Sequence, residues 1–376
     1  MKHLIILICL LTAFCSLIYA QTNLLWNIDE IDKGQTYGHD IFDDGRNIHI
    51  SYINDEEELI YGVKLSNNTW KKEKLDKGAI RASRIKIDSK GVIHIVYFYY
   101  SSNNFTVMHA SKKPNNDWEY NEIGKDCGYE SGTGGIGFDI DERGNLYVTY
   151  SYFFQTPNPA NPWFQDSKYG VMLASYNGRQ WAYEEIFKEG SLSNSTNVII
   201  DRNTIHVAFR HEITRDRFQV VYGRKPLSGG SFTFETVASF MPQNRNLSWL
   251  DSDIFLACKD GNVFISYTYD GNLNVAVKKN NSTSWIKSAG NGSKGNIVYN
   301  NNSIWIVSCS RNSGLILGSS GINDISIKND IIYNDLGSLA GLYERPAFSF
   351  RNKKHIIFVK TASNYDEFKL IHMYEK

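Results

Sequence analysis

Two histidines of this 376-residue chain stand outside its regular pattern and could exchange protons near neutral pH. His39 lies in the stretch Tyr37-Gly38-His39-Asp40, and His211 follows Arg210 at the end of an apolar stretch. An imidazole with an ordinary pKa can serve as a general acid or base. A tyrosine and an arginine would complete a site that abstracts a proton beside a negative charge. The catalytic candidates are therefore His39, His211, Tyr152 and Arg210.

Arginines from distant segments supply a second kind of chemistry, the binding of anions. A guanidinium grips a carboxylate through two parallel hydrogen bonds, so converging arginines would suit a uronate, a sialate or a sulfated sugar. Exposed aromatic rings beside them would stack on sugar rings. The alternative is that these arginines pair with acidic residues of neighbouring segments. The binding candidates are Arg84, Trp163, Arg245, Asp253, Glu344 and Arg345.

A five-residue repeat provides the elements that would position these groups. Its pattern is aliphatic, ring, aliphatic, small or polar, ring, and its first ring recurs at steps of 41 to 59 residues. A strand-like unit at this spacing cannot bury its own faces, which favours a radial repeat. The seven copies begin at Ile48, Ile93, Leu146, Ile205, Val263, Ile304 and Lys354.

Histidine is frequent at the first ring position of this repeat, but the position also accepts other rings. A position that accepts histidine, tyrosine, phenylalanine and tryptophan requires a flat ring for packing. We therefore interpret these histidines as structural and exclude them from the candidate site. The seven residues concerned are His49, His94, Tyr147, His206, Phe264, Trp305 and His355.

Each repeat is the second of four predicted strands in one unit. Strands that begin with tryptophan close several units, as at Trp70, Trp118 and Trp181, and turns rich in Asn and Gly precede them. Seven such units predict an all-β, seven-bladed β-propeller of four-stranded antiparallel blades. The last unit lacks a fourth strand, and the strand starting at Trp26 has no unit of its own. We expect this N-terminal strand to complete the last blade.

The third unit carries a long insertion from Phe154 to Lys168 that contains Trp163. We expect this insertion, in which aromatic residues stand among prolines, to form a loop. Long loops in compact domains are commonly functional. A lid packed on its own ring is the alternative.

The N-terminus and the composition restrict where the protein acts. Residues 1–20 have a basic start, an apolar core and a small-residue end, which predicts a cleaved secretory signal before a single domain over residues 21–376. The sequence thus predicts a secreted protein, or a periplasmic one in a bacterium. With 40 basic and 40 acidic residues, nucleic acid is not an expected partner. No later stretch is long and apolar enough to span a membrane.

Neither a metal nor a cofactor is expected from the sequence. Cys127, Cys258 and Cys309 remain after the predicted signal, and their spacing suits no metal site. Buried free thiols, or one disulfide and one free thiol, are both compatible with this count. Asn-x-Ser/Thr sequons, for example at Asn67 and Asn104, would be glycosylation sites in a eukaryotic secretory pathway.

The turn Ser175-Tyr176-Asn177-Gly178-Arg179-Gln180-Trp181 resembles the Asp-box, or BNR repeat, of sialidase-superfamily propellers, with Asn in place of Asp. The resemblance implies the propeller fold, with these turns on the face away from the active site. The Phe/Tyr-Arg-Ile-Pro stretch of sialidases is absent. Some polysaccharide lyases share the fold, and His39 is similar in placement to their first histidine. Tyr52-Ile53-Asn54-Asp55 occupies the place of the second.

These observations favour a protein that binds or processes extracellular glycans, anionic ones above all, on the loop-rich face of the propeller. That face carries the connections between strands two and three and between successive blades. An enzyme of this kind would be a polysaccharide lyase or a glycosidase with a His/Tyr/Arg site. The third alternative is a non-enzymatic scaffold with a protein partner.

Overall fold

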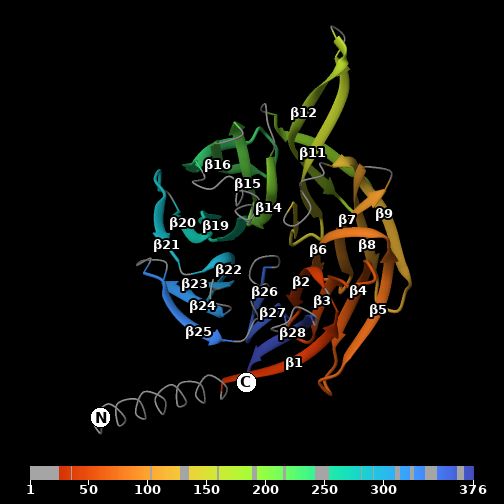
Figure 1. The fold of residues 1–376 in the computed structure, drawn as a ribbon, viewed down its shortest axis with the longest axis vertical. Coiled ribbons are helices and arrows are strands. Elements are labelled where there is room, and N and C mark those ends of the chain that lie inside the picture. Colours follow the sequence, from red (N-terminus) through yellow and green to blue (C-terminus); the bar gives the residue numbers. More distant parts are fainter. Residues whose placement is uncertain are drawn as a thin grey trace, which may run out of the picture.

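The computed structural model describes residues 25–34, 36–101, 104–127, 135–158, 161–188, 193–214, 217–241, 254–280, 282–290, 292–309, 314–321, 326–334, 345–361 and 368–376. These residues form seven four-stranded antiparallel blades arranged in a ring (Figure 1). The prediction of a seven-bladed β-propeller is confirmed. Among the described residues, no helix has the length and apolar character needed to cross a membrane.

The strands follow one another from the centre of the ring outward in every blade. Blade one contains β2 (Tyr37–Asp43), β3 (Ile48–Ile53), β4 (Glu58–Lys64) and β5 (Trp70–Lys77). Blade two contains β6 (Ala79–Ile87), β7 (Ile93–Ser101), β8 (Asn104–Lys112) and β9 (Trp118–Cys127). Blade three contains β10 (Ile136–Ile140), β11 (Leu146–Asn158), β12 (Asn161–Tyr176) and β13 (Trp181–Phe187). Blade four contains β14 (Ser193–Asp201), β15 (Thr204–Thr214), β16 (Arg217–Pro226) and β17 (Thr233–Phe240).

The remaining three blades repeat the same order. Blade five contains β18 (Ile254–Lys259), β19 (Asn262–Tyr269), β20 (Asn272–Lys278) and β21 (Ile286–Ala289). Blade six contains β22 (Ser293–Asn300), β23 (Ser303–Cys309), β24 (Leu315–Gly321) and β25 (Lys328–Tyr333). Blade seven contains β26 (Ala347–Phe350), β27 (Lys354–Thr361), β28 (Phe368–Glu375) and β1 (Trp26–Lys33).

The N-terminal strand closes the ring, as the sequence predicts. β1 pairs antiparallel with β28, from Trp26 opposite Glu375 to Lys33 opposite Lys369. Ile31 lies at an irregularity of this ladder and is buried against blade one. The orphan strand at one end of the chain therefore completes the incomplete blade at the other.

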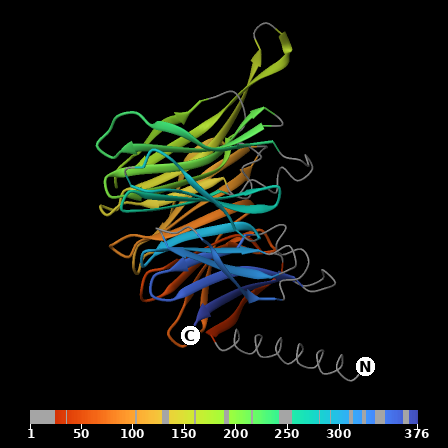
Figure 2. The ribbon, with the colours of Figure 1, turned by 90° about the vertical axis from the view of Figure 1, so that its left-hand side faces the viewer.

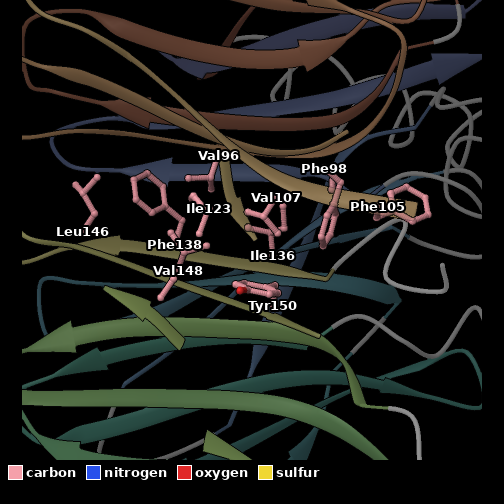
Figure 3. Close-up of a cluster of buried hydrophobic side chains, with 12 residues drawn as sticks. Val96, Phe98, Phe105, Val107, Ile123, Ile136, Phe138, Leu146, Val148 and Tyr150 are labelled. Carbon is pink, nitrogen blue, oxygen red and sulfur yellow. The ribbon is translucent and has the colours of Figure 1, made fainter. Parts of the chain in front are cut away.

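The hydrophobic cores lie between successive blades. Strand two is buried on both faces, as in β3, whereas the outer strands β1 and β5 alternate between covered and exposed positions. This gradient explains why the sequence repeat is strongest at strand two. Figure 3 shows the cluster between blades two and three, where Phe98 and Val107 of blade two approach Ile136 and Tyr150 of blade three. Burying one such side chain stabilises the fold by about 1.5–3 kcal/mol.

The prediction of a loop in blade three is wrong, because the insertion prolongs the two paired strands β11 and β12. β11 and β12 stay paired from Phe154 opposite Lys168 to Pro157 opposite Gln165. They form a long hairpin that projects from the ring (Figure 2). Two strands that extend beyond their neighbours have free outer edges, where prolines do not break a ladder. The prolines that suggest a loop are thus compatible with a hairpin.

Several other expectations fall partly outside the described residues. The predicted signal, residues 1–20, lies wholly outside them. Cys258 is a free thiol, which both alternatives allow. The side chain of Cys127 is not among those described.

Candidate functional site

Three of the predicted site residues meet where blades seven, one and two adjoin at the centre of the ring. His39 lies on β2, Arg84 on β6, and Arg345 lies two residues before the start of β26. All three are buried, with exposed fractions of 2% for His39 and 7% for each arginine. We name these three residues the His39 cluster. β2 packs against both β6 and β26, which brings the three segments together.

Burial and two neighbouring guanidinium groups determine the protonation state of His39. Burial, the charge of Arg345 and the charge of Arg84 lower the pKa of His39 to about 3. Hydrogen bonds with the backbone of Arg345 and Ile357 oppose this shift in part. His39 is therefore neutral at physiological pH, and the cluster presents two fixed positive charges beside an uncharged imidazole.

Two hydrogen bonds orient Arg84 on β6 and fix β6 against β2 of the neighbouring blade. Its Nη1 donates to the carbonyl oxygen of Ser83 at 2.8 Å, and the Ser83 hydroxyl donates to the carbonyl of Gly38 at 2.7 Å. Gly38 has a φ of +59°, and a Cβ there would lie 2.9 Å from the backbone of Ala82. Only glycine permits this approach of β2 to β6 without strain.

Three other predicted residues have their surroundings in blades three and four. The hydroxyl of Tyr152 donates to the carboxylate of Glu185. The guanidinium of Arg210 lies 3.7 Å from the centre of the Phe218 ring. The His211 ring packs edge-on against Phe187, with centroids 4.9 Å apart. These contacts orient the three side chains.

The remaining candidates lie beyond what the structure describes. Arg245, Asp253 and Glu344 are outside the described residues. Trp163 belongs to β12, and its side chain is not among those described. In the described part of the chain, no three His, Cys, Asp or Glu side chains are grouped to hold a metal ion.

The repeat histidines form hydrogen-bonded ring stacks on the opposite face, which we call the short-turn face. This face carries the turns between strands one and two, such as 44–47, and between strands three and four, such as 65–69. In blade one, His49 Nδ1 lies 2.8 Å from the Tyr61 hydroxyl, and Trp118 of blade two packs edge-on against Tyr61. His49 Nε2 lies 3.2 Å from a carboxylate oxygen of Asp44.

The same arrangement recurs around the ring. A strand-two histidine bonds a strand-three ring, and the strand-four tryptophan of the next blade packs on that ring. Burial lowers the pKa of His206 to about 4 and that of His355 to about 3, so both stay neutral. The structural interpretation of these histidines is thus extended from packing to hydrogen bonding. The further triplets are His94, His109 and Trp181; His206, Tyr222 and Trp285; and His355, His372 and Trp70.

Two clefts open between blades on the short-turn face, and the sequence analysis missed both. The larger, of about 640 Å³, lies between blades four and five and includes His206 and Arg224 in its lining. The smaller, of about 310 Å³, lies between blades one and two and includes His49 and Val63. Arg224 and Val63 occupy equivalent positions of the repeat, and this difference is one sequence signal that distinguishes the larger cleft.

Comparison with known proteins relates the chain to other propellers. No family model and no curated protein matches the sequence. A crystal structure of polysaccharide lyase Uly1 matches with a TM-score of 0.57 and 10% identity over 90% of each chain. The BP39L lectin from Burkholderia pseudomallei matches with a TM-score of 0.57 and 9% identity, over 91% of this chain and 98% of the lectin.

A mutant of the NanB sialidase from Streptococcus pneumoniae matches more distantly. Its TM-score is 0.46 and its identity 10%, over 91% of this chain and 68% of the sialidase. The two matches with TM-scores of 0.57 show that the chain shares the propeller fold with these two proteins.

Proposed function

We propose that the protein is secreted and binds anionic glycans on its loop-rich face, with the His39 cluster as the centre of the site. The observation that carries this proposal is the convergence of Arg84 and Arg345 beside His39. A carboxylate or sulfate placed between two guanidinium groups gains charge-assisted hydrogen bonds in a region shielded from water. Secretion is inferred from the signal-like residues 1–20.

The low pKa of His39 supports binding over proton abstraction. A general base works best when its pKa is near the operating pH, and that of His39 lies at about 3. A neutral imidazole so weakly basic serves better as a hydrogen-bonding partner for a sugar hydroxyl. The alternative is that the His39 cluster acts as a lyase or glycosidase site. Treating the protein with the same sugars distinguishes this alternative from binding alone.

The test is a titration of the protein with uronate-containing, sulfated, sialylated and neutral oligosaccharides by calorimetry. Replacing either arginine of the cluster, as in Arg84→Gln or Arg345→Gln, should weaken binding of the anionic sugars about tenfold or more, because a hydrogen bond to a charged group contributes about 1.5–3 kcal/mol. Arg84→Lys, which keeps the charge, should recover part of the affinity. Arg179→Gln, at an exposed turn of the short-turn face, should bind as the wild type does.

Three results would decide against the proposal. Equal binding by the wild type and by both folded arginine variants would show that the His39 cluster is not the site. New unsaturated sugar ends, followed by their ultraviolet absorbance, would show lyase chemistry instead. No binding to any sugar of the panel would favour the protein-scaffold alternative. Thermal melting of each variant confirms that it is folded.

A further inference from the structure

The cleft between blades four and five is built from the turns and strand ends of both blades. β15 and β16 form one wall, and β19 with the turn after β20 forms the other, in the green and cyan part of the ring (Figure 1). Its volume of about 640 Å³ falls within the range of small-molecule sites. It lies on the short-turn face, away from the His39 cluster.

Five basic side chains line this cleft, and three of them are neutralised by carboxylates. Arg202 pairs with Asp260, Lys225 with Glu184, and Lys278 with Glu235, each at 2.6 Å. The other two are Arg224 and Lys279. Within the described part of the chain, neither of these two forms an ion pair with a carboxylate. The cleft therefore has two cations available to a ligand.

The base of the cleft combines a buried pair of rings with the carboxylate of Asp201. His206 and Tyr222 are 5% and 1% exposed, and His206 Nδ1 lies 2.6 Å from the Tyr222 hydroxyl. Trp285 packs edge-on against Tyr222 with centroids 5.4 Å apart. The carboxylate of Asp201 accepts a hydrogen bond from the Gly261 backbone N–H at 2.8 Å, which ties the two blades together. A ligand would thus meet a preformed surface.

The rim of the cleft is rich in neutral hydrogen-bonding groups. Hydroxyl and amide side chains can pair with several sugar hydroxyls without a charge penalty. Apolar ligands would leave these groups unpaired, so the lining favours a polar, hydroxylated ligand. The residues concerned are Thr204, Ser231, Thr233, Asn280, Ser282 and Thr283.

The smaller cleft between blades one and two provides an internal comparison. Val63 lies opposite His49 in the strand register there, as Arg224 lies opposite His206 in blade four. The three lysines that line the smaller cleft all have carboxylate partners: Lys71 and Lys112 pair with Glu73, and Lys113 pairs with Glu119. The same backbone framework thus gives one cleft with available positive charge and one without it.

We propose that the cleft between blades four and five binds a saccharide that carries one anionic group, with this group held between Arg224 and Lys279 and the sugar hydroxyls on the polar rim. The anion is a carboxylate of a uronic acid or a sulfate ester. The residues of this site are distinct from those of the His39 cluster, so each of the two proposals can be refuted without affecting the other.

The experiment measures binding of glucuronic acid, N-acetylglucosamine 6-sulfate, neutral N-acetylglucosamine and inorganic sulfate to the full chain by NMR titration. Both anionic sugars, or one of them, should bind more tightly than the neutral sugar and than sulfate. Arg224→Val, which copies the smaller cleft, should weaken that binding at least tenfold. Val is tolerated at the equivalent position in blade one, and Arg224 is exposed, so the variant should fold.

Control variants distinguish binding in this cleft from binding at the His39 cluster. Lys113→Gln in the smaller cleft and Arg84→Gln in the His39 cluster should leave the perturbed resonances of blades four and five unchanged. Equal binding of the neutral sugar, equal binding of inorganic sulfate, or unchanged binding by Arg224→Val would overturn the proposal. Loss of all binding in Arg84→Gln alone would assign the observed sugar to the loop-rich face and would likewise overturn it.

Discussion

Replacing Ile31 by alanine should measure how strongly the N-terminal strand holds the ring closed. Ile31 of β1 is 5% exposed and packs in a cluster with Ile41 and Ile50 of blade one and Leu370 of blade seven. The substitution removes buried methyl and methylene groups and leaves a cavity between two blades. Such changes cost about 2–5 kcal/mol of unfolding free energy. Because native domains are stable by only about 5–15 kcal/mol, the loss should be conspicuous.

The matched control is Ile28→Ala on the same strand. Ile28 is 45% exposed, so its replacement should change the unfolding free energy by no more than about 0.5 kcal/mol. Urea unfolding followed by both tryptophan fluorescence and circular dichroism gives the two values, provided that the transitions coincide. A cost below about 1 kcal/mol for Ile31→Ala, or equal costs for the two variants, would refute the view that β1 is an integral strand of blade seven.

Two further predictions concern charge. Burial lowers the pKa of His109 and of His355 to about 3, so below the ordinary value of about 6.5 these groups bind protons in the unfolded chain but not in the folded one. Their contribution to the free energy of unfolding is therefore complete above pH 6.5. As the pH decreases below this value, the free energy of unfolding should fall by about 1.4 kcal/mol per pH unit for each histidine. A urea midpoint that stays constant from pH 7 to pH 4.5 would contradict this. Glu235→Gln should cost about 1–3 kcal/mol, because it leaves the Lys278 ammonium, 12% exposed, without its charged partner. The exposed pair of Arg202 with Asp260 serves as the control, since Arg202→Gln should cost less than about 1 kcal/mol in the same urea-unfolding assay.

The architecture was predictable from the sequence because one strand of each blade is buried on both faces. That constraint keeps an aliphatic and ring pattern at strand two, and it survives the variable spacing between blades. The role of the N-terminal strand was predictable for another reason: the segment that begins at Trp26 has no partner strands of its own in the sequence. The hairpin of blade three was not predictable, because Pro157 in a strand with a free edge has the same sequence signature as a loop.

The candidate sites were predictable only in part. His39, Arg84 and Arg345 stand out as polar residues that break the repeat, and ring closure then brings the first and last blades together around them. The cleft between blades four and five depends on which cations find carboxylates in the adjacent blade. A single sequence does not reveal that Arg224 lacks such a partner among the described residues, because pairing across blades depends on side-chain geometry.

Blade seven is built from strands of both ends of the chain, and this has a consequence for the chain's topology. The backbone N–H of Lys376 donates to the carbonyl of Leu25 at 3.1 Å, so the two ends of the ring already adjoin. A circular permutant could join these ends by a short linker and open at the turn containing Gly229 and Gly230, where a Cβ added to either glycine would meet no atom within 4 Å. Blade seven would then become a local hairpin sheet, and the longest-range contacts would move to blade four. The order in which the blades assemble would therefore depend on where the ring is cut.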